Sequence, residues 1–299
     1  NPELYITGQD LETMTEEELG ERIKQVNIFA RVVPEQKLKL VNALKRNDEI
    51  VAMTGDGVND APALKAAHIG IAMGEKGTDV AREASSLVLM NDNFSSIVGA
   101  IRMGRRIFDN LQKAFAYVFA IHVPIAGLSL IPALIPGMPL VLWPVHIVFL
   151  ELIIDPACSI IFEAEKEEKN IMSRPPRREG DKFFGPRKIL FCCLQGAGIL
   201  VVCMAVCVIA MRLGLPEAEA RAMTFTTLVV SNLAVILTNR SWTENIFKIL
   251  ATPNKAVVWV SGGAVFFLGV ALNTPFFLDM FKFAPLSPLD LAICTAAGL

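Results

Sequence analysis

A glycine-containing turn in the first quarter of the chain carries two carboxylates. Residues 54–60 (TGDGVND) follow a short apolar run, and their two glycines let the backbone turn sharply and approach a ligand closely. Asp56 and Asp60 supply the oxygen ligands that Mg²⁺ prefers, and Mg²⁺ commonly bridges such carboxylates to a phosphate. Lys37, at the start of an expected helix, can bring a compact positive charge to a phosphoryl oxygen. These residues predict magnesium-dependent phosphate chemistry; a solvated loop is the alternative for the Gly-Asp-Gly turn taken alone.

A second pair of carboxylates lies in an apolar run. Glu151 and Asp155 are four residues apart, so in a helix they share one face, and prolines at 144 and 156 loosen the backbone on either side. A charged side chain near mid-membrane costs about 2.5–3.5 kcal/mol on insertion scales. A hard cation bound by both acids, or a shared proton, offsets that cost. We predict a cation site whose acids face neighbouring spans; the alternative is an interfacial pair or pairing with Lys or Arg.

Composition divides the chain into a charged region suited to water and an apolar region suited to a lipid bilayer. Of the 299 residues, 53% are hydrophobic and 19% charged, which is too apolar for an ordinary soluble domain. We predict a soluble domain over residues 1–108 and a transmembrane domain in a lipid bilayer over residues 109–299. A net charge of −2, without a basic patch interleaved with aromatics, excludes nucleic acid as a partner. The six cysteines form no Cys-x-x-Cys pair and are predicted to be core hydrophobes, not zinc ligands or disulfides.

Strand-like and helix-like stretches alternate in residues 1–108, which predicts a parallel sheet with helices on its faces. Thr15 and Glu18 form a capping box at one helix start, and Pro34 opens a second helix that runs to about Arg46. Ligands of such open sheets bind beyond the carboxyl ends of the strands, where residues 54–60 are expected. The expected strands cover residues 27–32, 49–53, 68–73 and 86–90.

Two of these segments resemble motifs of one known family. Residues 53–65 (MTGDGVNDAPALK) resemble the hinge motif of P-type ATPases, and residues 29–37 (FARVVPEQK) resemble that family's lysine motif. The resemblance, closest to the P2 group that includes the calcium pumps, covers essentially the whole chain. It implies an α/β parallel-sheet fold of the haloacid-dehalogenase type, present as part of a phosphorylation domain, with ATP and Mg²⁺ as cofactors.

The resemblance also implies roles for the matching residues. Asp56 would bind Mg²⁺, Lys37 would neutralise the phosphoryl group, and Asp60 would hold the loop. Asn59 would hydrogen-bond the phosphate or nucleotide, and Arg31 would lie near the nucleotide. The Asp-Lys-Thr-Gly-Thr motif, whose aspartate is the family's nucleophile, does not occur in this sequence. The chain is therefore expected to be a C-terminal fragment, inactive by itself, whose partner is the N-terminal part of the same pump.

Apolar runs of the second region predict an α-helical bundle of about six spans, the last one truncated. Runs of about 20 residues suffice to cross a bilayer at 1.5 Å per residue. A helix without a break from Phe94 to about Ile131 is expected to link the soluble domain rigidly to the membrane. The predicted spans cover residues 114–135, 138–162, 188–211, 222–238, 256–273 and 286–299.

Basic residues in the connections predict a multi-pass protein whose soluble domain is cytoplasmic. The connection 163–188 contains eight Lys or Arg residues, and the connection 239–255 contains three. On the opposite side, residues 136–137 contain none, residues 212–221 contain two, and Lys282 is one more. Excess Lys and Arg marks the cytoplasmic side of a membrane protein.

The resemblance extends to further cation ligands in the spans. Where calcium pumps of the sarcoplasmic-reticulum type carry an Asn and an Asp, this sequence has Glu151 and Asp155. His122 falls at an asparagine ligand of those pumps, and Ile125 falls at their glutamate. Asn232 matches an additional polar ligand. An interior histidine is the alternative for His122, and a helix–helix hydrogen bond is the alternative for Asn232.

The predicted function is ATP-driven transport of a divalent cation, with Ca²⁺ as the first candidate, through an aspartyl-phosphate intermediate. Mn²⁺, Mg²⁺ and proton counter-transport stay open. One rival is a membrane-tethered phosphohydrolase of the haloacid-dehalogenase type, which would need its own nucleophilic aspartate. The other rival is a non-catalytic channel or regulatory subunit, which the intact set of Lys37, Asp56, Asn59 and Asp60 disfavours.

Overall fold

The structure is a computed structural model that describes residues 5–177 and 182–299 and divides into two compact units. Unit 1 extends to Met103 and includes a short stretch from Pro176, whereas unit 2 comprises Gly104–Pro175 and Lys182–Leu299. Residues 1–4 of the predicted soluble domain and Arg178 of the predicted basic connection lie outside the described residues.

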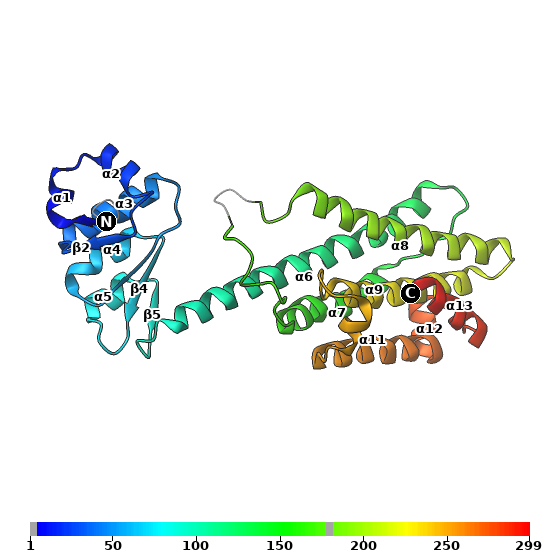
Figure 1. The fold of residues 1–299 in the computed structure, drawn as a ribbon. Helices are drawn as coiled ribbons and strands as arrows, with labels where there is room; N and C mark the ends of the chain where they lie inside the picture. The colour runs from blue at the N-terminus through cyan, green and yellow to red at the C-terminus, as the bar shows by residue number, and fades with distance from the viewer. Residues whose placement is uncertain (1–4, 178–181) are drawn as a thin grey trace. The chain divides into compact units, whose positions relative to one another are not determined.

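Unit 1 is made of short parallel strands alternating with helices, as predicted (Figure 1). β1 pairs with β2, while β3, β4 and β5 form a second sheet in that order, and every pair is parallel. The elements are β1 (Tyr5–Thr7), α1 (Gly8–Thr13), α2 (Glu16–Arg22), β2 (Ile28–Ala30), α3 (Pro34–Arg46), β3 (Ala52–Gly55), α4 (Ala61–Ala66), β4 (Ile69–Met73), α5 (Asp79–Ala84) and β5 (Leu87–Leu89).

Local sequence signals set the helix starts in unit 1. The Thr15 backbone N–H donates to Glu18 Oε2 at 3.0 Å, and the Glu18 N–H donates to Thr15 Oγ1 at 3.2 Å, which is the predicted capping box of α2. Pro34 occupies the first turn of α3, where its missing N–H leaves no hydrogen bond unmade. The strands are three to five residues long, shorter than predicted, because the turns begin within the apolar runs.

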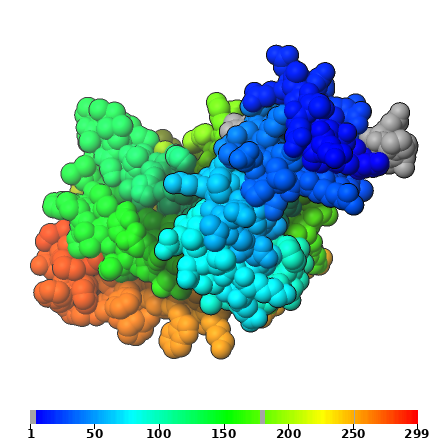
Figure 2. Space-filling model, turned by 90° about the vertical axis from the view of Figure 1, so that its left-hand side faces the viewer, coloured from blue at the N-terminus to red at the C-terminus, as the bar shows by residue number. Residues whose placement is uncertain are grey.

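Unit 2 is a helical bundle, and α6 begins in unit 1 and ends in unit 2 (Figure 1). α9 is its central helix, because 78% of the 18-residue apolar stretch of α9 is buried, against 22% of the corresponding stretches of α8 and α11. The green surface of α7 adjoins the orange surface of α11 and α12 (Figure 2). The elements are α6 (Ser95–Leu134), α7 (Pro144–Pro156), a π-helix (Ala157–Phe162), α8 (Pro186–Arg212), α9 (Glu217–Asn239), α10 (Ile246–Ala251), α11 (Lys255–Asn273), α12 (Pro275–Phe281) and α13 (Pro288–Gly298).

Five helices in the described residues are long and apolar enough to cross a membrane. They are α6, α7 with its π-helix, α8, α9 and α11. The predicted count of six is not confirmed, since α13 has only 11 residues. The second predicted span also starts later than residue 138: α7 begins at Pro144, because Pro139 and Pro144 both disfavour helix in the residue before them.

The long helix α6 begins at Ser95, close to the predicted start at Phe94, and continues through Pro124 and Pro132, past the predicted end near Ile131. Pro124 has no N–H, so the Ala120 carbonyl lacks its usual partner within the helix. Gly196 of α8 packs on that carbonyl so closely that a Cβ there would lie 2.3 Å from the oxygen. Glycine is required at this helix contact, because a side chain would separate α6 from α8.

Buried ion pairs tie α6 to the connection that follows α7. Lys113 Nζ lies 2.7 Å from Glu168 Oε1, and these side chains are 1% and 7% exposed. Burial alone raises the pKa of Glu168, but hydrogen bonds from Lys113, Thr243 and Ser241 outweigh it, so the net pKa lies below its ordinary value. Arg174 lies 2.5 Å from Asp109 of α6 in a second pair. The connection is thereby fixed to α6 by charge.

Replacing Lys113 with Met is expected to destabilise unit 2 by about 3–5 kcal/mol, because Glu168 would keep its burial and lose its cation. The double variant K113M/E168Q should recover much of that loss, since it leaves no unpaired charge. Thermal unfolding of the chain in detergent would measure both. K282M, which removes an exposed pair with Asp279, should change little; equal losses in K113M and K282M would contradict the assigned role.

Candidate functional site

The two segments singled out in the soluble region meet at the carboxyl ends of β2 and β3. Lys37, in the first turn of α3, places its Nζ 2.6 Å from Asp60 Oδ1. The Gly57 backbone N–H donates to Asp60 Oδ2 at 3.4 Å. Asp60 is buried, with 6% of its surface exposed, whereas the Lys37 side chain is 37% exposed. Lys37 is therefore a partly exposed side chain whose ammonium contacts a buried carboxylate.

Backbone geometry explains why Asp60 points inward. A Cβ on Gly55 would lie 2.6 Å from the Asp60 Cβ, so only glycine leaves room for that side chain. A 3₁₀ turn over Val58–Asp60 folds the loop back, and the Thr78 N–H donates to the Asp56 carbonyl at 2.9 Å. The loop is thus held from inside by Asp60 and from outside by the start of α5.

The other predicted phosphate-site residues lie at the surface of the same region. Asp56 and Asn59 are exposed on the loop, and Arg31 is exposed with a φ of 55°. The structure therefore brings Lys37 and Asp60 into contact, while the side chains of Asp56, Asn59 and Arg31 face solvent. An exposed carboxylate on the loop whose buried Asp60 holds the Lys37 ammonium suits a hydrated Mg²⁺ ion and a phosphate, so the residues present fit the expected cofactors.

Two supporting residues were missed from sequence. Gln36 donates to the Gly8 carbonyl at 2.8 Å and accepts from the Val33 N–H at 3.1 Å, which fixes the segment between β2 and α3. The sequence could have indicated the bond from the Val33 N–H, because a glutamine three residues after a helix N-cap commonly accepts a hydrogen bond from the N-cap backbone. Thr78 caps α5 with its side chain, which accepts from the Ala81 N–H.

Asp60 makes unit 1 sensitive to acid. Burial alone raises the pKa of Asp60, but the Lys37 ammonium and the Gly57 and Asp56 N–H groups outweigh it and hold the pKa below its ordinary value. A lowered folded-state pKa stabilises the fold above the unfolded pKa of about 3.9, and this stabilisation is lost as the pH falls through the folded pKa.

Replacing Lys37 with Met is expected to lower the stability of unit 1 near pH 6 and to weaken its further loss on acidification, because the pKa of Asp60 rises when the Lys37 ammonium is removed while burial stays. Hydrogen–deuterium exchange of peptides covering residues 34–60, corrected for intrinsic rates, would follow the opening from about pH 6 to pH 3. Lys24→Met, which removes an exposed pair with Glu21, is the matched control. The same acid response in both variants would show that Lys37 does not hold Asp60.

The second predicted site lies on α6 and α7 of unit 2. His122 Nε2 is 3.9 Å from Glu151 Oε1, and the two side chains are 49% and 42% exposed. Asp155, one turn further along α7, is exposed. Glu151 thus lies near α6, whereas this chain's own described helices leave Asp155 uncovered, and the expectation that both acids face neighbouring spans stays a prediction. His122 is likewise exposed and is not the interior histidine of the alternative.

Asn232 of α9 contacts Tyr117 of α6 through a hydrogen bond. It is fully buried, and its Oδ1 accepts a hydrogen bond from the Tyr117 hydroxyl of α6. The alternative of a helix–helix hydrogen bond is therefore what the structure contains, and a ligand role for Asn232 stays a prediction. Its Nδ2 is buried without a hydrogen-bond partner among the described residues. Across those residues, no three His, Cys, Asp or Glu side chains gather closely enough to hold a metal.

Comparison with known proteins bears on both units. The family described as "Cation transporting ATPase, C-terminus" matches residues 139–299, which is more than half of the chain. The chain belongs to the cation-transporting ATPase family. The family described as "haloacid dehalogenase-like hydrolase" matches residues 6–68 of this ATPase chain, which include both Lys37 and Asp60. The predicted family and the predicted fold class are confirmed.

Curated relatives of this ATPase chain carry calcium in their names. It is 36% identical over 287 residues to Calcium-transporting ATPase 1 of Yarrowia lipolytica, covering 96% of this chain and 31% of that protein. It is 37% identical over 256 residues to Calcium-transporting ATPase 1 of Lactococcus lactis, covering 86% and 29%. It is 32% identical over 289 residues to mouse Calcium-transporting ATPase type 2C member 1, covering 96% and 31%. The chain spans about a third of the length of these relatives.

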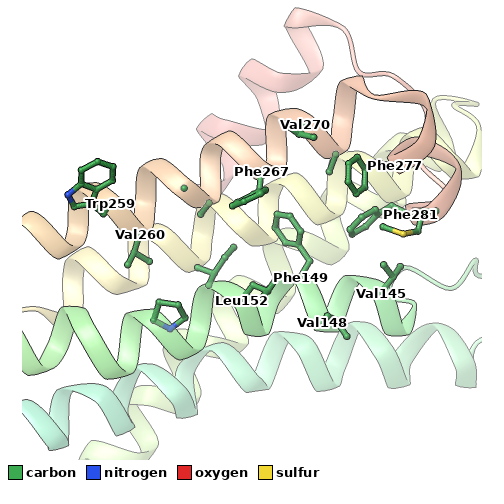
Figure 3. A pocket seen from close by; sticks show the side chains of 16 residues that line it. Val145, Val148, Phe149, Leu152, Trp259, Val260, Phe267, Val270, Phe277 and Phe281 are labelled. Atoms are coloured by element: carbon green, nitrogen blue, oxygen red, sulfur yellow. The ribbon is translucent and has the colours of Figure 1, made fainter.

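An apolar pocket of about 580 Å³ lies on another face of the ATPase's α7. Phe149 and Leu152 of α7 line it together with Phe267 of α11 and Phe281 of α12 (Figure 3). No acidic, basic or amide side chain lines this pocket. It therefore offers no ligand for a cation, and the polar side of α7 that carries Glu151 is the candidate for transport.

Proposed function

We propose that the chain is the C-terminal part of a pump that uses ATP to move a divalent cation, with Ca²⁺ as the first candidate, across a membrane. The observation that carries the proposal is the combination of the Lys37–Asp60 loop in unit 1 with Glu151 on a membrane-length helix of unit 2. Family membership and the calcium-transporting relatives support it. The basic connections favour a cytoplasmic position for unit 1.

In the phosphate half of the site, each residue acts from its observed position. Asp56, exposed beyond the end of β3, would hold Mg²⁺, and Lys37, whose side chain is partly exposed, would meet a phosphoryl oxygen with its ammonium. Asn59, exposed on the loop after β3, and Arg31, exposed just after β2, would contact phosphate or nucleotide. Mg²⁺, when bound, supplies positive charge to the phosphate as negative charge builds up during transfer. Asp60 keeps the loop in shape for these contacts.

The strand arrangement leaves a place for the nucleophile. In the described residues β2 pairs only with β1, and β3 pairs only with β4, so each has an unpaired edge. Ile28 of β2 is 59% exposed, and β3 is exposed or half-buried along its whole length, which is unusual for strands of a parallel sheet. We propose that a strand from another part of the pump pairs there. Its carboxyl end would carry the aspartate toward Lys37 and Asp56.

The two sites would be coupled through α6. This helix is continuous over Ser95–Leu134 and is clamped to the connection after α7 by Lys113–Glu168 and Arg174–Asp109. Arg105 of α6 also donates to the Ile171 and Arg174 carbonyls at 2.8 and 2.7 Å. A movement of α6 would therefore be passed to α7 and to Glu151. Because Asp155 is uncovered and a carboxylate is costly in hydrocarbon, the rest of the pump would cover that side of α7.

The proposal is tested on the complete pump in sealed proteoliposomes. ATP hydrolysis is measured with Ca²⁺, Mn²⁺, Zn²⁺ or no added divalent cation besides Mg²⁺, together with uptake of radioactive Ca²⁺. We expect hydrolysis to rise with one of the added cations and uptake of that cation to require ATP. Hydrolysis that ignores every added cation would favour the tethered phosphohydrolase, and cation flux without ATP would favour the channel.

A further inference from the structure

Five phenylalanine rings join α6 to the segment that leads into α8, and they form the phenylalanine cluster (Phe108, Phe115, Phe119, Phe183 and Phe184). The Phe183 ring lies 5.1 Å from the ring of Phe108 and 5.5 Å from that of Phe115, measured between ring centroids. The Phe184 ring lies 5.9 Å from the ring of Phe119. These pairs meet edge to face, an arrangement that aromatic rings favour. Phe115 and Phe119 are exposed, so the described helices leave one side of the cluster uncovered.

Polar contacts fix the segment that leads into α8. The buried Gln112 side chain of α6 donates to the Phe183 carbonyl and accepts a hydrogen bond from Lys188 Nζ at 2.8 Å. The same ammonium lies 4.3 Å from the centre of the Trp242 ring, just beyond the end of α9. The cluster is therefore held on the helix bundle as a preformed surface.

The start of α8 lies at the boundary between lipid headgroups and hydrocarbon. α8 has 27 residues, so at 1.5 Å per residue it is about 40 Å long, longer than the roughly 30 Å hydrocarbon core. Its exposed side chains change from charged at Arg187 and Lys188 to apolar at Leu190 and Phe191, which places the boundary within its first turns. Lys182 and Arg187 are exposed on the headgroup side, and neither forms an ion pair with another described residue.

We infer that the phenylalanine cluster, with Lys182 and Arg187, binds an anionic phospholipid of the membrane. The two cations contact the headgroup phosphate, and the exposed sides of Phe115 and Phe119 contact the start of an acyl chain. Basic residues next to a membrane helix attract anionic lipids, and aromatic rings gather at the same boundary. Charge complementarity thus selects an anionic headgroup, and the uncovered rings select a lipid and not a free phosphate. The inference goes beyond the pump proposal, because it requires only that α8 crosses a bilayer.

The test measures lipid binding to the complete pump in detergent, without ATP or a transported cation. Fluorescent phosphatidylglycerol is the anionic probe, and fluorescent phosphatidylcholine with the same acyl chains is the neutral probe. We expect the natural protein to prefer phosphatidylglycerol, and K182Q and R187Q each to weaken that binding about fivefold while phosphatidylcholine binding stays unchanged. Added salt should reduce the preference, because it screens exposed charges. R212Q, which removes an exposed cation at the opposite end of α8, should bind phosphatidylglycerol as the natural protein does.

Four results would overturn the inference. An unchanged preference in the double variant K182Q/R187Q would show that these cations do not hold the headgroup. Equal losses in R187Q and R212Q would reduce the effect to the general charge of the chain. Displacement of the probe by millimolar inorganic phosphate would show that the cations bind any phosphate without help from the rings. A loss of thermal stability in the double variant that is the same with both lipids would mean that another part of the pump covers the cluster. All four leave ATP-driven transport standing, since cation-stimulated hydrolysis tests it separately.

Discussion

Asp56→Asn in the complete pump is expected to lower phosphoenzyme formation from ATP at least about a hundredfold. Asn keeps the shape of the side chain and removes the negative charge, so Mg²⁺ would lose its anionic protein ligand at the end of β3. The loop itself should persist, because its internal support is Asp60, bonded to Lys37 and to the Gly57 N–H. Acid-stable incorporation of labelled phosphate measures the effect, at several Mg²⁺ concentrations.

Glu21→Gln is the matched control for Asp56→Asn, since it also removes one carboxylate from unit 1. Glu21 is 78% exposed and pairs only at the surface with Lys24, so its loss should leave phosphoenzyme formation unchanged. Recovery of phosphoenzyme formation by D56N at high Mg²⁺ would support a direct contact between Asp56 and the metal, because a higher Mg²⁺ concentration can offset weaker Mg²⁺ binding. Normal phosphoenzyme formation in D56N at low Mg²⁺ would remove the role assigned to Asp56.

Much of unit 1 could be predicted because its signals are local. The Thr15–Glu18 capping box and Pro34 mark helix starts through contacts within one turn. The motifs assigned Lys37 and Asp60 to one phosphate site, but their contact joins the ends of strands from two separate sheets, which the sequence did not distinguish. The hydrogen bond from Gln36 to Gly8 was not predictable, because its partners are 28 residues apart and no local pattern records that distance.

In unit 2, sequence patterns predict which segments form helices but not how those helices pack. Apolar length located the spans, but length alone cannot tell that α7 starts at Pro144 or that α9 lies at the centre of the bundle. Lys113 directly precedes the predicted span 114–135, and no local pattern indicates that it is almost fully buried against Glu168. Helical periodicity predicts Glu151 and Asp155 on one side of α7, yet which side another helix covers depends on packing between distant segments.

Glu151→Gln and Asp155→Asn are expected to reduce cation-stimulated ATP hydrolysis strongly and to raise the half-maximal cation concentration by at least about tenfold. Each change keeps a carbonyl oxygen and removes a charge, so loss of function would report on charge and not on packing. The loss should be greater for Glu151, which lies 3.9 Å from His122 of α6. Phosphoenzyme formation from inorganic phosphate, which needs no bound transported cation if the cycle is reversible, should persist in both variants and would show that unit 1 is intact.

Asp279→Asn provides the control for these acids, because Asp279 lies in the short helix α12 with its side chain 85% exposed and forms a surface ion pair with Lys282. It should leave the cation dependence unchanged. The double variant E151Q/D155N tests whether the two acids act on one ion: ligands of a shared cation are coupled, so their losses should not add. Additive losses would place the acids at separate ions, and unchanged cation dependence in all three variants would refute α7 as the transport site.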